Sequence, residues 1–140
     1  MTPKNELKKA FLEKYKWDVK ALEQIDREIT QLRLKILPGG ISYDGMPHGS
    51  GTNNADLANY AVTMDEYLAK FKQQRNILLK DLNEIVLAVE QVENVQSQVL
   101  LRYRYIELKS WREIAAIMCY AEDYVKRHLH SKALNDFEIP

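Results

Sequence analysis

The stretch IMCYAED, residues 117–123, decides whether the C-terminal part of the chain forms one helix or two. It contains no Gly, Pro, Asn or Ser, so local propensity favours a continuous helix. The neighbouring segments, SWREIAA at 110–116 and YVKRHLH at 124–130, instead suggest two short helices joined by a sharp turn. A turn here predicts a DNA-binding protein, whereas a straight helix would leave no function indicated.

The segment before this stretch carries its own helix-start signal. Ser110 with Glu113 three residues on has the form of a capping box, which predicts that a helix begins at Trp111. Another helix is expected just upstream, from about Ser97 to Leu108. Periodicity alone does not separate one C-terminal helix from two, because one stripe also fits an uninterrupted helix. That stripe consists of Ile114, Met118, Ala121, Val125, Leu129 and Lys132.

A turn in this stretch needs a left-handed residue, and Cys119 is the predicted position. Gly is usual at such a position, and its absence costs roughly 1 kcal/mol. Ala121 stands where a Ser-like helix cap is usual, at roughly the same further cost. On the residues alone these two costs leave a turn and a straight helix both open. The capping box at 110–113 and the family resemblance described below favour the turn, with a non-helical Cys119 and a second helix that starts at Ala121.

The rest of the chain predicts two long helices. Thr2 and Pro3 suit a helix start, and apolar residues then recur every three or four positions as far as Ile36. A Gly-rich loop is expected at 38–54, which holds all five glycines, followed by a helix with apolar spacing from Leu57 to Val92. The predicted class is all-α: a long antiparallel helical hairpin (1–95), then a helix-turn-helix domain (96–140). The apolar stripes exceed what one hairpin buries, which favours a homodimer.

Composition limits the function classes. The chain has 140 residues, 46% apolar and 29% charged, and no apolar run reaches the roughly 18–20 residues of a membrane span. One cysteine and a highly charged N-terminus favour a cytoplasmic protein without a secretory signal. Twenty basic and twenty acidic residues balance overall, but residues 100–134 hold seven basic and four acidic ones. This local excess fits a DNA-binding surface or simply a solvated helix face.

Motifs for catalysis and for metal binding are absent. The sequence has no phosphate-binding Gly-x-x-x-x-Gly-Lys loop, no Cys-x-x-Cys and no His-Glu-x-x-His. His128 and His130 are two residues apart, so on a helix they point away from each other and do not chelate one metal. The HGSG at 48–51 is interpreted as part of a linker, since Ser50 has no identifiable base. Neither an enzyme, a cofactor nor a metal is predicted.

As a helix-turn-helix, residues 111–130 have a defined inside and outside. Trp111, Ile114, Ala115, Val125 and Leu129 are expected to hold the unit together. With these residues inward, polar side chains of the second helix project outward, where they can reach a major groove. The predicted groove-facing residues are Glu122, Asp123, Lys126, Arg127 and His130, with Arg112 and Lys132 on phosphates.

The C-terminal segment resembles the helix-turn-helix of the sigma-70 region 4 type. The matching residues are Leu-x-x-Arg-Tyr-Ile at 101–106, Ser110-Trp111, Ile114-Ala115, Tyr120, Val125, the RHLH at 127–130 and Ala133-Leu134. In addition, YDGMPHGSG at 43–51, followed by ADLANY at 55–60, is similar to the loop of ArpU/RinA-like phage regulators. Leu108, Cys119 and Ala121 depart from the usual Gly, Gly and Ser.

The resemblance implies a phage or prophage transcriptional regulator, often of late packaging and lysis genes. Double-stranded DNA is then the expected partner, in the cytoplasm of a bacterial host, and contact with RNA polymerase stays open. Two alternatives also stay open. One is a helical adaptor or inhibitor whose sigma-like tail binds a protein, and the other is a small DNA-packaging component that forms rings.

Overall fold

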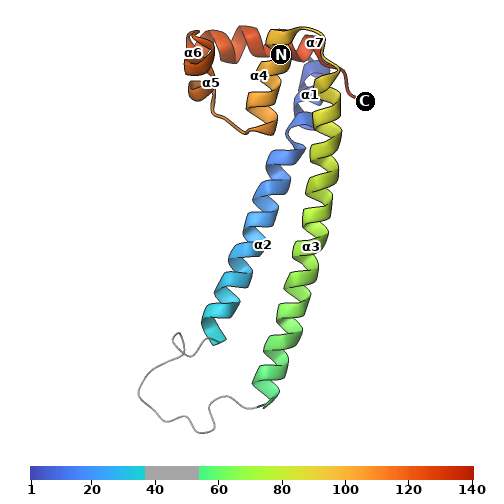
Figure 1. Ribbon diagram of the computed structural model, residues 1–140, viewed down its shortest axis with the longest axis vertical. Coiled ribbons are helices and arrows are strands. Elements are labelled where there is room, and N and C mark those ends of the chain that lie inside the picture. The colour runs from blue at the N-terminus through green and yellow to red at the C-terminus, as the bar shows by residue number, and fades with distance from the viewer. Residues whose placement is uncertain (37–53) are drawn as a thin grey trace. The chain divides into compact units, whose positions relative to one another are not determined.

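A computed structural model describes the backbone of residues 1–36 and 54–140, and within these ranges the chain is helical without a strand (Figure 1). The predicted all-α class is confirmed. The predicted Gly-rich loop, with MPHGSG at 46–51, lies in the part of the chain outside the described residues.

The N-terminal helix begins as the sequence predicts but is broken near its start. In α1 (Pro3–Leu12) the Thr2 side chain accepts a hydrogen bond from the Asn5 N–H at 3.2 Å, and Pro3 fills the first helical position. At Glu13 ψ opens to −7°, and α2 (Lys14–Ile36) continues beyond this break. The single predicted helix is therefore two helices joined at one residue.

The middle of the chain is a long helix followed by a capped turn. After α3 (Asn54–Glu90), the Asn94 side chain accepts a hydrogen bond from the Ser97 N–H at 3.0 Å and starts α4 (Val95–Leu101). This helix runs on as a π-helical turn, η1 (Arg102–Ile106). The helix expected at about 97–108 is thus present at 95–106.

The decisive stretch does turn. In α5 (Trp111–Met118) the Ser110 hydroxyl accepts from the Glu113 N–H at 3.1 Å, as the capping box predicts. Cys119 then adopts the left-handed conformation at φ 61°, ψ 42°, and the Tyr120 N–H bonds back to the Ala115 carbonyl at 3.1 Å. This is the backbone pattern of a Schellman helix end.

The second helix begins after Ala121, which is extended at φ −68°, ψ 140° and caps with no side-chain hydrogen bond. Three consecutive segments form it: α6 (Glu122–Tyr124), the π-helical turn η2 (Val125–Leu129) and α7 (His130–Asp136). Both the left-handed Cys119 and the helix start at Ala121 are confirmed. We refer to residues 122–136 as the recognition helix, a name taken from the helix-turn-helix prediction above.

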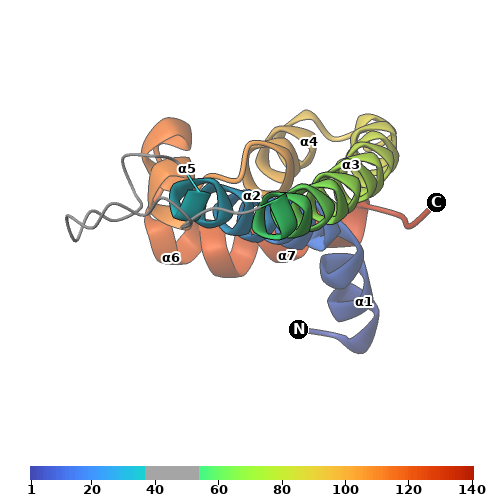
Figure 2. The same ribbon diagram turned by 90° about the horizontal axis from the view of Figure 1, so that it is seen from below.

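The chain divides into two compact units, which are described separately. The first comprises Met1–Val19 and Ile77–Pro140, and the second comprises Lys20–Asn76. The expected boundary at residue 95 therefore does not coincide with the division, because the N-terminal helix and the end of α3 belong with the C-terminal helices. In the first unit α7 packs against α4 and α1, and α6 contacts α5 (Figure 2).

One apolar core holds the first unit together. Its buried side chains are Leu12, Ile85, Ala88, Val89, Val92, Leu100, Leu101, Tyr105, Ile114, Ala115, Val125, Leu129, Ala133, Leu134 and Phe137. Trp111 is partly buried against the same cluster. The five residues predicted to hold the helix-turn-helix together therefore all pack in or on this core.

Polar contacts fasten α1 to the end of α7. The Lys8 ammonium, only 4% exposed, donates to the Leu134 carbonyl at 2.8 Å, and the Asn5 amide donates to Asn135 Oδ1 at 2.9 Å. The last carbonyls of a helix lack intrahelical partners, so a buried cation there satisfies them and complements the helix dipole. The N-terminal helix is consequently part of the structure that supports the recognition helix.

The second unit consists of parts of α2 and α3, which run side by side in opposite directions (Figure 1). Ile29 and Met64 are buried, whereas Leu57 and Leu68 on α3 are exposed by 46% and 43%. The predicted apolar stripe of α3 is thus only partly covered.

Two non-Gly residues with positive φ, Leu108 at 56° and Cys119 at 61°, should be sites of strain. We expect Cys119→Gly and Leu108→Gly each to raise the free energy of unfolding, by about 0.5–1 kcal/mol, because Gly adopts this conformation without a Cβ clash. Urea denaturation followed by circular dichroism measures the effect. As a control, Ala116→Gly inside α5 should lower stability by about 1 kcal/mol. A loss of stability in both turn variants would contradict the assigned backbone.

Candidate nucleic-acid interface

The candidate interface is the outer face of the turn and of the recognition helix. Six of the seven residues predicted to contact DNA are exposed: Arg112, Glu122, Asp123, Lys126, Arg127 and Lys132. Arg112 lies in the first turn of α5, Lys132 lies in α7, and the others lie at the start of the recognition helix. This end of the helix is set by the left-handed Cys119, which ends α5 and redirects the chain.

An ion pair joins two of these residues. Asp123 Oδ1 lies 3.0 Å from Arg127 Nε, one helical turn apart, and both side chains remain about three-quarters exposed, at 74% and 73%. An exposed pair with this spacing contributes only about 0.3–0.5 kcal/mol to folding. Its main effect is to restrict where the Arg127 guanidinium lies.

The prediction that His130 projects outward is wrong. Its side chain is 2% exposed, and its Nε2 lies 2.6 Å from the Tyr105 hydroxyl in a buried hydrogen bond. His128, two residues earlier, is exposed instead.

The π-helical turn accounts for this correction. The His130 N–H bonds to the Val125 carbonyl, five residues back, so η2 holds one residue more than an α-helical turn. The helix is consequently rotated after Val125, and His130 and Leu134 are buried together with Leu129 and Ala133.

His130 and Tyr105 occupy an aromatic site beneath the interface. The Trp111 ring meets His130 edge-on at 4.6 Å between centroids, and the Arg104 guanidinium lies 4.4 Å above Trp111. Burial, followed by the positive charges of Lys9 and Arg104, lowers the pKa of His130 from 6.5 to about 4. Burial raises the pKa of Tyr105, so both side chains are neutral at pH 7. The pair ties η1 to the recognition helix without a buried charge.

The lowered pKa predicts a pH-dependent stability. The unfolded chain takes up a proton on His130 near pH 6.5 and the folded chain only near pH 4, so stability should fall as the pH drops between these values. The loss should reach about 3 kcal/mol below pH 4. Urea denaturation at several pH values, compared between wild type and His130→Gln, isolates this contribution. Equal pH dependence in the two proteins would show that His130 is not held neutral.

A row of exposed aromatic rings, not predicted from the sequence, flanks the charged residues. Tyr120, Tyr124 and His128 stack in order, with centroids 5.4 Å and 5.3 Å apart, and Gln96 donates to the Tyr120 hydroxyl at 3.2 Å. Their spacing of four residues is a signal that was visible in the sequence. Aromatic rings with polar edges are suited to surfaces that bind phosphates or a partner protein.

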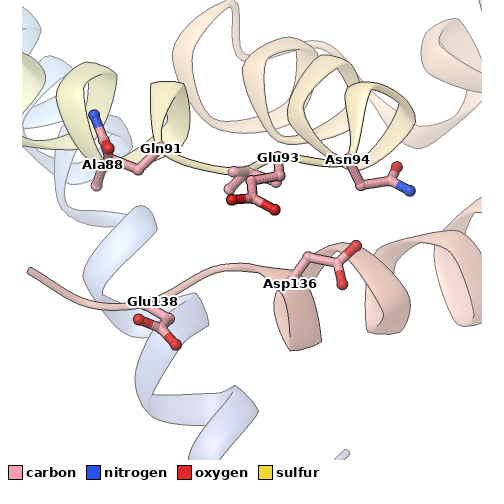
Figure 3. Close-up of a pocket in the computed structure, with 7 residues that line it drawn as sticks. Ala88, Gln91, Glu93, Asn94, Asp136 and Glu138 are labelled. Carbon is pink, nitrogen blue, oxygen red and sulfur yellow. The ribbon is translucent and has the colours of Figure 1, made fainter.

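An acidic pocket lies elsewhere in the first unit. Gln91, Glu93 and Asn94, from the end of α3 and the following linker, face Asp136 and Glu138 across it (Figure 3). The Ser97 hydroxyl donates to Asp136 Oδ2 at 2.6 Å. The pocket's carboxylates repel phosphate, so this surface is unsuited to nucleic acid.

Among residues 1–36 and 54–140, no group of three or more His, Cys, Asp or Glu side chains could hold a metal ion. No helix in these ranges is both long and apolar enough to cross a membrane.

No protein-family model, curated protein or solved structure matches this chain.

Proposed function

We propose that this protein binds double-stranded DNA in a sequence-specific manner and regulates transcription, as a phage or prophage protein in the cytoplasm of its host. The recognition helix enters the major groove, with Glu122, Asp123, Lys126 and Arg127 toward the bases. Arg112 and Lys132 contact the flanking phosphates. The resemblance to sigma-70 region 4 and to ArpU/RinA-like regulators agrees with this proposal, late packaging and lysis genes being the expected targets.

The observation that carries the proposal is the turn at Cys119, with the exposed polar start of the helix that follows it. A major groove about 12 Å wide admits one helix, and a short tight turn lets the N-terminal residues of that helix reach base edges. If the helix ran straight through Cys119, these side chains would lie in the middle of one long helix and not at the start of a short one. The acid-free run from Tyr124 to Lys132 gives the inserted helix the positive charge that DNA requires.

Salt dependence tests the phosphate contacts. The affinity for duplex DNA should fall as salt rises, each phosphate contact adding about −0.9 to the log–log slope. Arg112→Ala and Lys132→Ala should each make this slope less steep by about 1 while leaving sequence preference intact. Fluorescence anisotropy of labelled duplex measures the slope. Lys72→Ala, an exposed lysine on α3, is the control and should not change it. A complex insensitive to salt would contradict the proposal.

A protein-binding role is the second candidate, because apolar side chains are exposed around the turn. Ile117, Tyr120 and Tyr124 are exposed by 48%, 44% and 44%. Such a surface suits an adaptor or inhibitor, or contact between a DNA-bound regulator and RNA polymerase. Ile117→Ser would separate the roles, since loss of a protein partner with unchanged DNA affinity assigns this residue to protein contact.

We further propose that the protein is a homodimer through the exposed leucines of α3, Leu57 and Leu68. Burial of such side chains against a second copy would stabilise the association. Light scattering should give twice the chain mass, whereas a ring of many copies would favour the DNA-packaging alternative.

A further inference from the structure

We propose that Asp123 and Arg127 act together as a guanine-reading unit, in which Arg127 contacts the base and Asp123 is a positioning residue. The inference rests on the proposed DNA-binding function and adds the base that the site recognises. It follows from the chemistry of one ion pair.

Asp123 lies beside one edge of the Arg127 guanidinium. The ion pair joins Asp123 Oδ1 to Arg127 Nε, at 3.0 Å. A guanidinium carries five N–H donors in a planar fork, of which Nε supplies one. With Asp123 beside Nε, the two terminal NH2 groups form the other, end-on edge of the fork.

The end-on edge of Arg127 matches the acceptors of guanine. Guanine presents two acceptors side by side in the major groove, O6 and N7, and a bidentate arginine is the commonest specific contact to them. Adenine, cytosine and thymine do not offer two adjacent acceptors there. Neighbouring Lys126 is a compact point charge without a planar fork, so it matches a pair of acceptors less well than Arg127 does.

Asp123 affects DNA binding in two ways. The pair is too exposed to matter for folding, yet holding a long side chain in one orientation reduces the entropy lost on binding. Its carboxylate also repels phosphates, which weakens binding to DNA of any sequence. Asp123 therefore raises discrimination while lowering non-specific affinity.

The guanine-reading unit predicts opposite changes in the affinity for mixed-sequence duplex and in the preference for guanine. In Asp123→Ala, affinity for mixed-sequence duplex should rise, because a negative charge near the phosphates is removed, while preference for the guanine-containing site should drop several-fold. Glu138→Ala is the control, since Glu138 is an exposed acid that lies outside the recognition helix and is not paired with Arg127. It should leave the mixed-sequence affinity and the guanine preference unchanged.

The probes are duplexes that the wild-type protein enriches from a random library, with each guanine replaced in turn by 7-deazaguanine. Loss of N7 at one position should lower wild-type affinity several-fold, because 7-deazaguanine keeps O6 and so lacks one of the two acceptors. Arg127→Ala, which removes the donors, should bind natural and 7-deaza duplexes equally.

The outcomes separate this inference from the function on which it rests. Wild-type binding that no 7-deazaguanine affects, or full guanine preference in Asp123→Ala, would overturn the guanine-reading unit alone. Absence of any duplex binding by the wild type would overturn the proposed function and this inference together.

Discussion

Phe137→Ala should lower the free energy of unfolding of this protein by about 3–5 kcal/mol, the usual cost of removing a fully buried Phe. The side chain is completely buried, and its ring lies 6.1 Å from that of Phe11 on α1. It belongs to the same core as Val125 and Leu129 of the recognition helix. The substitution leaves a cavity where α1 meets the end of α7. The recognition helix should then be held less firmly in its orientation, and DNA affinity should fall.

Chemical denaturation followed by circular dichroism measures this cost. Ile139→Ala is the matched control, because Ile139 is apolar, lies two residues further on and is 45% exposed. It should cost less than about 1 kcal/mol. Equal effects of the two substitutions would mean that the C-terminal residues do not belong to the core.

The double substitution Lys126→Ala/Arg127→Ala should weaken binding to a specific duplex by about 100-fold. An arginine that reads a base contributes about 1–3 kcal/mol, and loss of the groove-facing Lys126 removes a second positive charge that attracts DNA. Both residues are exposed, so folding stability should stay within about 0.5 kcal/mol of the wild type. Loss of affinity without loss of stability is the signature of a contact surface.

A control with the same change in composition lies on α3. Lys72→Ala/Arg75→Ala also removes one lysine and one arginine from exposed positions. These two positions lie in the second compact unit. Its affinity for the duplex should stay within about twofold of the wild type. Similar losses in the two variants would point to a general effect of net charge rather than to the recognition helix.

Much of the fold could be predicted from local sequence signals. Thr2 and Ser110 cap the helices that they were predicted to cap. The turn at Cys119 was indicated by the capping box and the family resemblance, since the apolar spacing also fits an uninterrupted helix. Capping and turns depend on residues within one or two helical turns, which a single sequence displays. The association of α1 with α7 could not be predicted in this way, because Lys8 and Leu134 are 126 residues apart.

The candidate site was predicted correctly where the helix is regular and wrongly where it is not. Asp123, Lys126 and Arg127 are exposed as expected, whereas His130 is buried. The expectation assumed α-helical spacing, and η2 adds one residue to a turn, which rotates everything after it. A histidine among charged neighbours gives no sign that it will bond to a tyrosine 25 residues earlier.

Selection of random-sequence duplexes at physiological salt tests the central claim most directly, with the wild type and Lys126→Ala/Arg127→Ala in parallel. The wild type should enrich a defined motif, and the double variant should fail to enrich it while folding normally. A wild type that enriches no sequence, or a double variant that enriches the same motif with the same affinity, would contradict DNA recognition by this helix.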